Sequence, residues 1–268
     1  MSDVLNPACV FFGRELQRKR AALELTQEEL ASKLGCTPGW VSKMESGKKI
    51  SKDSADDLDT FFKTDGIFFR MWELSKEIEL HAAVPPGYPE YLTREKAATS
   101  VRKFDGYLVP GLLQTEAYAS AVLSANEFPD MADRLLAERL TRQEIFTKPN
   151  APHCFFAIDE VALRRRVGNA EIMRAQYEAL LRASELPNVT IVVIPENTGY
   201  YPGLAGSFTV LGMEDGSHMA YTESAGAGML IGERARVAKY LLRYETLVGY
   251  ALPVTESLAL IRKLMEEL

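Results

Sequence analysis

Apolar residues recur at helical spacing near the start of the chain. Phe12 and Leu16 lie one turn apart and predict a helix over residues 11–23. Thr26 and Glu29 have the spacing of a capping box, in which each side chain bonds the backbone N–H of the other residue. A second helix is therefore expected directly after Thr26.

A tight turn joins this second helix to a third. Gly35 can take the left-handed conformation that ends a helix, and Thr37 followed by Pro38 begins the next one. Val41 and Met44 form the buried pair of that third helix, which ends near residue 46. Two short helices joined in this way form a helix-turn-helix, whose second member can enter the DNA major groove.

Two more helices are expected before the pattern changes. Residues 52–62 predict a short helix that closes the small bundle. Residues 67–80 predict a connecting helix that is too apolar to face water, so we expect it to dock on a second domain or on a second copy of the chain. Prolines and a glycine at 85–87 break this helix.

Beyond residue 88, helical and β patterns alternate, which is typical of a layered domain. Helices are expected at 90–98, 115–125, 130–147, 169–185, 233–248 and 255–267. Strands are expected at 100–107, 153–158, 189–194, 206–212, 219–223 and 228–231. Residues 189–195 are apolar on both faces, as a central strand covered on two sides would be.

These patterns predict a mainly α N-terminal helix-turn-helix bundle followed by a larger α/β (α+β) C-terminal domain. We assign residues 1–65 to DNA binding and residues 66–87 to a connecting helix and proline-rich linker. Residues 88–268 then form a domain for effector or partner binding and for dimerisation.

Charge and cysteine content narrow the class of protein. The 268 residues carry a net charge of −6, but residues 1–52 contain nine basic and six acidic side chains, which indicates a basic binding head on an acidic body. Cys9, Cys36 and Cys154 lie far apart, which argues against a disulfide framework or a zinc-thiolate site. No stretch approaches the roughly 18 apolar residues of a membrane span. We expect a cytoplasmic protein that associates with the nucleoid when bound to its operator and that has no membrane partner.

The helix-turn-helix residues also carry a family resemblance. Gln27, Leu30, Ala31, Leu34, Gly35, Val41, Ser42, Glu45 and Gly47 stand in the order that resembles the phage-repressor-like (XRE-type) helix-turn-helix family. The resemblance covers about residues 12–62 and implies that residues 38–46 are the recognition helix. It also implies that Gln27 contacts a DNA phosphate.

Groove-facing side chains follow from that placement. Pro38 and Gly39 have no side chain that reads a base edge, so the expected base contacts are Thr37, Trp40, Ser42 and Lys43. Trp40 is equally consistent with packing in the core. Lys48 and Lys49 follow the helix and are expected to contact phosphates, the alternative being a solvated charge pair. So few base contacts imply that DNA shape contributes to specificity.

Four blocks in the larger domain carry a second resemblance. They lie at 109–119, 139–143, 158–165 and 203–208. Together they resemble the effector-like domain of unknown function that follows a helix-turn-helix in actinobacterial, WhiJ-like and antitoxin-like regulators. That resemblance covers about residues 66–266 and implies a small partner protein, often encoded nearby, that alters DNA binding.

The larger domain shows no constellation for catalysis, a metal or a cofactor. The three histidines of the chain are far apart, and the glycines of the larger domain match no phosphate-binding motif. Asp159 and Glu160 are more consistent with a helix cap than with a catalytic pair. The arginines at 164–166 suit an anion or an acidic partner, or else pair with Asp159 or Glu160. We therefore expect no enzyme, no metal and no cofactor.

The sequence thus predicts a sequence-specific transcriptional regulator that binds operator DNA as a homodimer and receives a signal from a small partner protein or ligand. The candidate partner-binding or ligand-binding residues are Gln114, Arg164, Arg165, Tyr200 and Tyr201. Two alternatives stay open. One is an antitoxin that neutralises a small toxin and regulates itself through DNA binding, and the other is an enzyme tethered to DNA.

Overall fold

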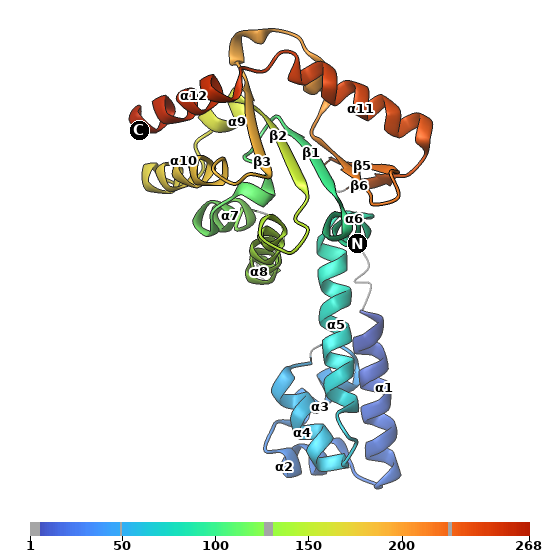
Figure 1. Ribbon diagram of the computed structural model, residues 1–268. Coiled ribbons are helices and arrows are strands. Elements are labelled where there is room, and N and C mark those ends of the chain that lie inside the picture. Colours follow the sequence, from blue (N-terminus) through green and yellow to red (C-terminus); the bar gives the residue numbers. More distant parts are fainter. Residues whose placement is uncertain (1–5, 49, 126–130, 225–226) are drawn as a thin grey trace. The chain divides into compact units, whose positions relative to one another are not determined.

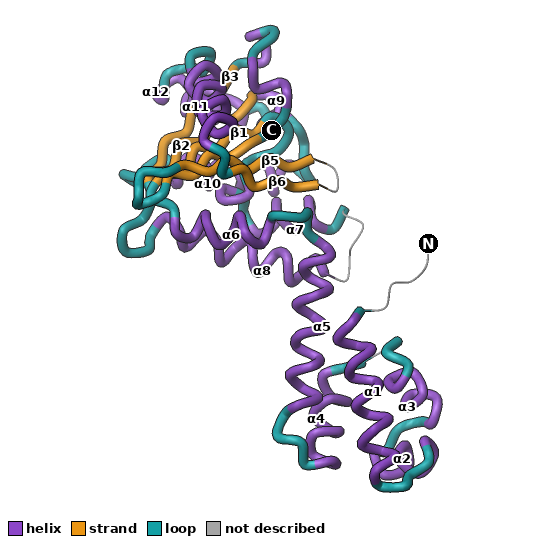
Figure 2. The backbone as a smooth tube through the Cα atoms, turned by 90° about the vertical axis from the view of Figure 1, so that its right-hand side faces the viewer, coloured by secondary structure: helices purple, strands orange, loops and turns teal. Residues whose placement is uncertain are grey.

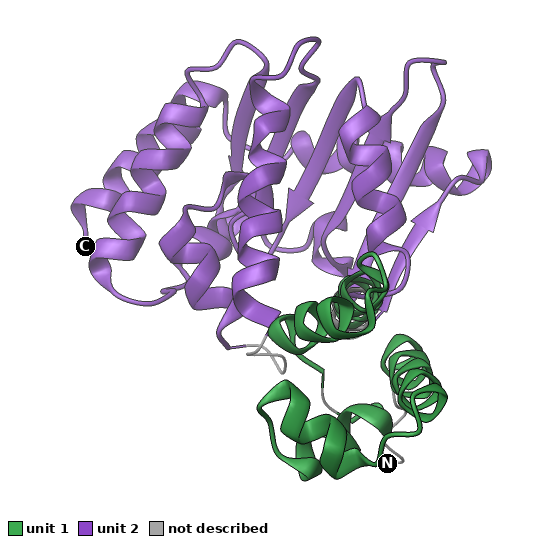
Figure 3. Ribbon diagram, turned by 90° about the horizontal axis from the view of Figure 1, so that it is seen from below, with its two compact units in different colours: residues 1–83 green, residues 84–268 purple. Residues whose placement is uncertain are grey.

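The computed structural model describes residues 6–48, 50–125, 131–224 and 227–268. The chain divides into two compact units, residues 1–83 and 84–268 (Figure 3). The division differs from the predicted one, because the helix assigned to a connecting segment belongs to the first unit.

The first unit is an all-helical bundle (Figure 2). Its helices are α1 (Pro7–Ala22), α2 (Gln27–Leu34), α3 (Pro38–Glu45), α4 (Lys52–Phe62) and α5 (Ile67–Ala83). The first helix begins earlier than expected, because Asn6 caps it by accepting from the Ala8 N–H and Pro7 stands at its first position. Thr26 and Glu29 form both bonds of the predicted capping box, and Gly35 is left-handed with φ +66°. Leu23 is exposed and takes no part in the core.

Helix α5 packs on the bundle instead of standing apart from it. It lies against α1 and α4, and Phe68 and Met71 are buried in the same core as Phe12. The Phe12 and Phe68 rings meet edge to face with centroids 5.0 Å apart. Phe68 and Met71, two of the apolar side chains that predicted docking elsewhere, thus find their partners within residues 1–83, whereas Leu74 is 48% exposed.

The second unit contains a six-stranded mixed sheet in the order β3-β2-β1-β4-β5-β6 (Figure 1). The strands are β1 (Ser100–Asp105), β2 (His153–Asp159), β3 (Val189–Ile194), β4 (Phe208–Gly212), β5 (His218–Ser224) and β6 (Ala227–Ile231). The first three are mutually parallel, and β4 to β6 are antiparallel to their neighbours. The helices are α6 (Tyr88–Ala97), α7 (Glu116–Leu123), α8 (Ala132–Arg142), α9 (Glu160–Arg164), α10 (Ala170–Ala183), α11 (Arg234–Val248) and α12 (Val254–Glu266). Single 3-10 turns lie at Gly111–Leu113, Gln143–Phe146, Glu196–Thr198 and Pro202–Ala205.

Each face of the sheet has its own core. Side chains such as Val101, Phe156 and Ile191 pack with helices α7, α10 and α12, and Phe104 and Phe208 pack with α11 on the opposite face. Strand residues alternate between these two cores, as the pleat requires. The predicted α+β architecture is confirmed.

Strand β3 is apolar on both faces but is not central, which corrects the prediction. It is the edge strand next to β2. Its outer edge is covered, because the Leu252 N–H donates to the Val193 carbonyl at 2.8 Å and the Val193 N–H donates to Ser257 Oγ at 2.9 Å. An edge shielded by α12 and the turn before it can be as apolar as an interior strand.

Because β1, β2 and β3 run in parallel, their carboxyl ends meet at one edge of the sheet. The segments that follow them, at 106–115, 159–169 and 195–207, emerge there, at the top of the sheet in Figure 1. This edge is where an open α/β sheet commonly binds its ligands.

Candidate functional site

The outer side of α3 is the candidate nucleic-acid interface. Thr37, Ser42 and Lys43 are exposed, whereas Val41 and Met44 on the opposite side are buried. Thr37 Oγ1 accepts from the Trp40 N–H at 3.2 Å and caps the helix, so its hydroxyl has its own hydrogen left to donate. These three positions stay predictions as base contacts, and the structure leaves them accessible.

Trp40 has a second role inside the bundle. Its side chain is partly buried against the core, and its indole Nε1–H donates to Ser54 Oγ of α4 at 2.9 Å. Ser51 donates to the same oxygen at 2.9 Å. Of the two expectations for Trp40, packing is therefore observed, and contact with a base stays a prediction.

A carboxylate that the sequence reasoning gave no role, Glu45, holds the start of α2 against the end of α3. Gln27 Nε2 donates to it at 2.7 Å, and Arg20 Nε and Nη2 donate to it at 2.5 and 3.1 Å. Arg20 also donates to the Leu25 carbonyl at 2.7 Å. The hydrogen bond to Glu45 raises the pKa of Arg20. Glu45 thereby fixes Gln27, the predicted phosphate contact, and leaves one N–H of its amide for DNA.

Two glycines allow α1 to approach α3. A Cβ on Gly13 would stand 2.3 Å from the Glu45 carbonyl oxygen, and one on Gly47 would stand 2.9 Å from the Cys9 carbonyl oxygen. Gly47 also has φ +70°, which disfavours any residue with a side chain. Its neighbour Lys48 is exposed, as a phosphate contact requires, whereas Lys49 lies outside the described residues.

In the larger unit, Gln114 is buried within the loop that follows β1. Its Nε2 donates to the Val109 carbonyl at 2.7 Å, and its Oε1 accepts from Arg139 Nη1 at 2.7 Å. Gln143 and Gln176 bond the backbone of the same loop. The side-chain amide of Gln114 is thus engaged in the internal bonding of this loop, and its role in binding stays a prediction.

The carboxylates after β2 have structural partners. Asp159 caps α9 by accepting from the Val161 N–H at 2.8 Å, as expected, and its other oxygen accepts from the Tyr201 hydroxyl. Burial and this carboxylate raise the pKa of Tyr201. Glu160 accepts from Arg164 Nε at 2.7 Å and from the Glu196 N–H at 3.1 Å.

Some of the remaining partner-binding candidates are exposed to solvent, and others are held by contacts within the unit. Arg164 also lies 3.5 Å from Glu196 and 3.6 Å from Glu267, so three carboxylates surround it. Arg165 is exposed and donates from Nε to the Tyr107 carbonyl at 3.1 Å. Tyr200 is 84% exposed, whereas Tyr201 is only 2% exposed. The structure therefore brings Arg164, Arg165, Tyr200 and Tyr201 to the carboxyl edge of the sheet, and Gln114 belongs to a separate network.

Within the described parts of the chain, no three histidine, cysteine, aspartate or glutamate side chains are grouped so that they could hold a metal ion. None of the helices there is long and apolar enough to cross a membrane.

Comparison with known proteins agrees with this division of the chain. A family described as a helix-turn-helix domain matches residues 12–66, and one described as a domain of unknown function (DUF5753) matches residues 88–263. No curated protein matches the chain. The helix-turn-helix match supports DNA binding as the role of the first unit. Because the second match spans well over half of its length, the chain belongs to the DUF5753 family and joins that domain to a helix-turn-helix.

Proposed function

We propose that the chain is a sequence-specific transcriptional regulator that binds its operator as a homodimer and whose larger unit receives a signal from a small partner protein. The exposed side of α3 carries this proposal, because Thr37, Ser42 and Lys43 face solvent on a helix whose other side is fixed in the core. Lys43 can donate to guanine in the major groove, and Lys48 can bind a phosphate.

Dimerisation follows from the size of that surface. Helix α3 has eight residues and is about 12 Å long, so a single copy reaches few base pairs. Two copies related by a two-fold axis would read half-sites about 10 base pairs apart. The second recognition helix raises both affinity and selectivity.

The signalling part of the proposal rests on the family resemblance of residues 66–266 to actinobacterial WhiJ-like, antitoxin-like regulators and on the exposed carboxyl edge. We infer a binding role for the larger unit instead of a catalytic one, because Asp159 and Glu160 are engaged by the α9 cap, Tyr201 and Arg164. A regulator with these properties would act in the cytoplasm, on the nucleoid. A partner that controls it must bind the DNA-competent and the incompetent states with different affinity.

Selection from random duplexes followed by titration tests the DNA-binding part. We expect the purified full chain to enrich one inverted repeat, and Lys43→Ala to weaken binding to that repeat by about 1–3 kcal/mol and to relax one base preference. Lys48→Ala should weaken binding to all duplexes alike. The slope of the logarithm of the binding constant against the logarithm of the salt concentration should become shallower by about one unit.

Lys76→Ala is the matched control, because Lys76 is a half-exposed lysine of α5 that pairs with Glu79 at 2.7 Å. Lys76→Ala should leave both the base preference and the salt dependence of DNA binding unchanged. A chain that enriches no sequence, or an equal loss for the lysine variants at 43 and 76, would contradict the proposal.

A further inference from the structure

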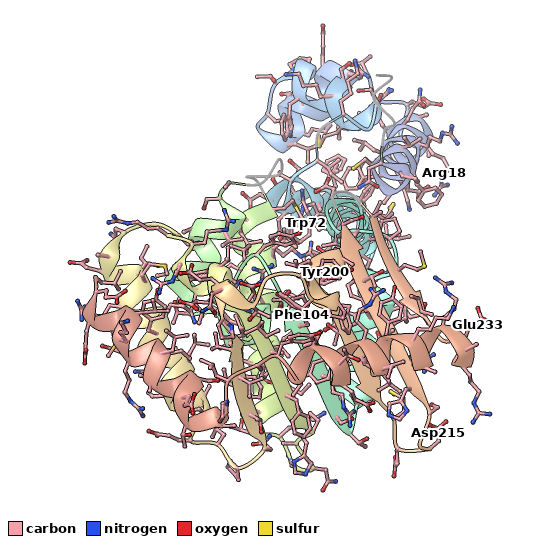
Figure 4. The ribbon with its side chains drawn as sticks, turned by 90° about the horizontal axis from the view of Figure 1, so that it is seen from above. Arg18, Trp72, Phe104, Tyr200, Asp215 and Glu233 are labelled. Carbon is pink, nitrogen blue, oxygen red and sulfur yellow. The ribbon has the colours of Figure 1, made fainter. Side chains whose placement is uncertain are left out.

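Exposed tyrosines of the chain gather at the carboxyl edge of β1 to β3. All 11 tyrosines lie within the described residues, and only Tyr107, Tyr200 and Tyr250 among them are exposed, at 59%, 84% and 46%. Leu204, 51% exposed, lies in the loop that also carries Tyr200. We call these four residues the tyrosine edge. Figure 4 views the molecule from above and labels Tyr200.

Hydrogen bonds and ring contacts connect neighbouring segments at this edge. Arg165 links the loop after α9 to the Tyr107 carbonyl, and the Leu204 N–H donates to the Tyr201 carbonyl at 3.2 Å. The Tyr201 and Tyr250 rings lie 6.2 Å apart between centroids. Tyr250 and the loop that carries Tyr200 and Leu204 thus meet at Tyr201, and the loop after α9 meets the segment after β1.

Tyr201 gives this surface a fixed base. Its ring is buried edge to face on Phe104 with centroids 6.0 Å apart, and its hydroxyl donates to Asp159. A Cβ on Gly203 would stand 2.4 Å from the Tyr201 ring, so only glycine allows the loop to lie this close. Side chains presented on a rigid base lose little conformational freedom on binding.

Two arginines at this edge have no carboxylate partner among the described residues, although the larger unit, with 19 basic and 23 acidic residues, is negative overall. Arg164 is surrounded by three carboxylates. Arg165 and Arg166 are exposed, and neither forms an ion pair with any residue that the structure describes. Tyrosine and arginine are among the residues most enriched at the centres of protein interfaces.

We propose that the tyrosine edge and Arg165–Arg166 form the docking site for a protein partner whose contact surface is apolar and carries carboxylates. This inference rests on the proposed signalling role of the larger unit and assigns a surface to it. A second copy of the chain fits less well, because a two-fold interface would set the arginines of both copies close together. Nucleic acid fits less well, because two exposed arginines beside the carboxylates around Arg164 are too few cations to neutralise a backbone of phosphates.

Photo-crosslinking of the full chain in the organism that encodes it identifies the partner. Benzoylphenylalanine replaces Tyr107, Tyr200 or, as a control, Leu242, which is 64% exposed on α11 outside this edge. We expect one protein adduct shared by positions 107 and 200 and missing at 242. An adduct of the chain with itself, an adduct that nuclease removes, or no adduct at the edge would overturn the proposal.

The crosslinked protein must then bind in purified form. Isothermal titration should show affinity for the full chain that falls as salt rises, and Tyr200→Ser or Arg166→Glu should weaken it at least about tenfold. Leu242→Ser and Arg134→Glu, at an exposed arginine of α8, are the matched controls and should change it by less than about twofold. Equal losses in the controls would overturn the assignment.

DNA affinity of the same variants separates the two proposals. Tyr200→Ser and Arg166→Glu should bind the selected operator as the unaltered chain does, because neither residue belongs to residues 1–83. A chain that binds its operator but has no partner at this edge refutes only the docking site. A chain that binds a partner here but selects no DNA refutes only the proposed regulator.

Discussion

The outer side of α3 and the tyrosine edge are both exposed, but they present opposite chemistry to solvent. The α3 surface consists of small polar side chains with one lysine, whereas the tyrosine edge carries three aromatic rings beside two arginines. A surface of the first kind gains affinity from phosphates and DNA shape, and one of the second kind gains it from buried aromatic area. The side chains that a surface exposes thus indicate the class of its partner before any partner is known.

The two surfaces also differ in the hydrogen bonds that hold their residues in place. Behind α3, a charged carboxylate, Glu45, holds Arg20 and Gln27. Behind the tyrosine edge, a neutral donor, the Tyr201 hydroxyl, bonds the Asp159 carboxylate, and glutamine amides bond the neighbouring loop. Removing a charged partner leaves a charge uncompensated, so α3 should be the more sensitive of the two.

The largest effect is expected where the close approach of α1 to α3 is disrupted, because only the first unit should lose stability. Gly13→Val should destabilise the first unit by about 3 kcal/mol or more, because its Cβ would meet the backbone at Glu45 and no side-chain rotation relieves that clash. Calorimetry should show a lower transition for residues 1–83 and an unchanged one for residues 84–268. Gly39→Ala, where a Cβ meets no atom within 4 Å, is the control and should not lower either transition. An unchanged first transition in Gly13→Val would refute the close approach.

Glu45→Ala comes next in expected effect. It leaves the Arg20 guanidinium, whose side chain is 15% exposed, without its carboxylate, and should cost about 2–3 kcal/mol of stability. Operator affinity should fall as well, because Gln27 loses its positioning bond. Urea denaturation and DNA titration measure the two effects, and Glu15→Ala, which breaks the exposed pair with Arg18, is the matched control. Equal losses of stability in Glu45→Ala and Glu15→Ala would show that the buried contacts of Glu45 stabilise the unit no more than the pair of Glu15 with Arg18 does.

On the other surface, Tyr201→Phe removes one hydrogen bond whose donor, unlike Arg20, is neutral. Asp159 keeps the Val161 N–H but loses the hydroxyl, so the second unit should lose about 1–2 kcal/mol. Thermal unfolding measures this loss, and Tyr250→Phe, at an exposed ring, should cost nothing measurable. A stability loss in Tyr201→Phe as large as that in Glu45→Ala would show that charged and neutral hydrogen-bonding partners stabilise the two surfaces equally.

Local signals in the sequence predicted most of the secondary structure. The capping box at Thr26 and the left-handed Gly35 fixed the helix-turn-helix, and both are observed. Predictions that depended on distant partners were less accurate. The runs at 67–80 and 189–195 are apolar for reasons that lie elsewhere in the chain, in the core around Phe12 and in the cover that α12 gives β3.

The candidate sites show the same limit. Residue type and position predicted that Ser42 and Lys43 lie on the exposed side of α3, and both are exposed. Tyr200 was predicted as a binding residue and is exposed, but only the structure places it at the sheet edge. Sequence could not separate Tyr200 from Tyr201, which are neighbours of the same type, because only the Asp159 and Phe104 contacts bury one of them. Glu45 went without a role since its partners lie 18 and 25 residues away.

The smallest expected effect separates the two roles of Trp40. Trp40→Phe and Ser54→Ala each remove the bond between α3 and α4, so each should cost about 1 kcal/mol of stability. Ser54→Ala should cost somewhat more, because Ser51 also loses its acceptor, and the double variant should cost less than the sum of the two single variants. If Trp40 acts on DNA only by holding α3, both single variants should weaken operator binding equally, because Ser54 lies on α4 and not on the recognition helix. If the Trp40 ring contacts a base, Trp40→Phe should change the preference at one position of the operator while Ser54→Ala leaves it intact. A change of base preference in Ser54→Ala would show instead that the placement of α3, more than any single side chain, determines which bases are read.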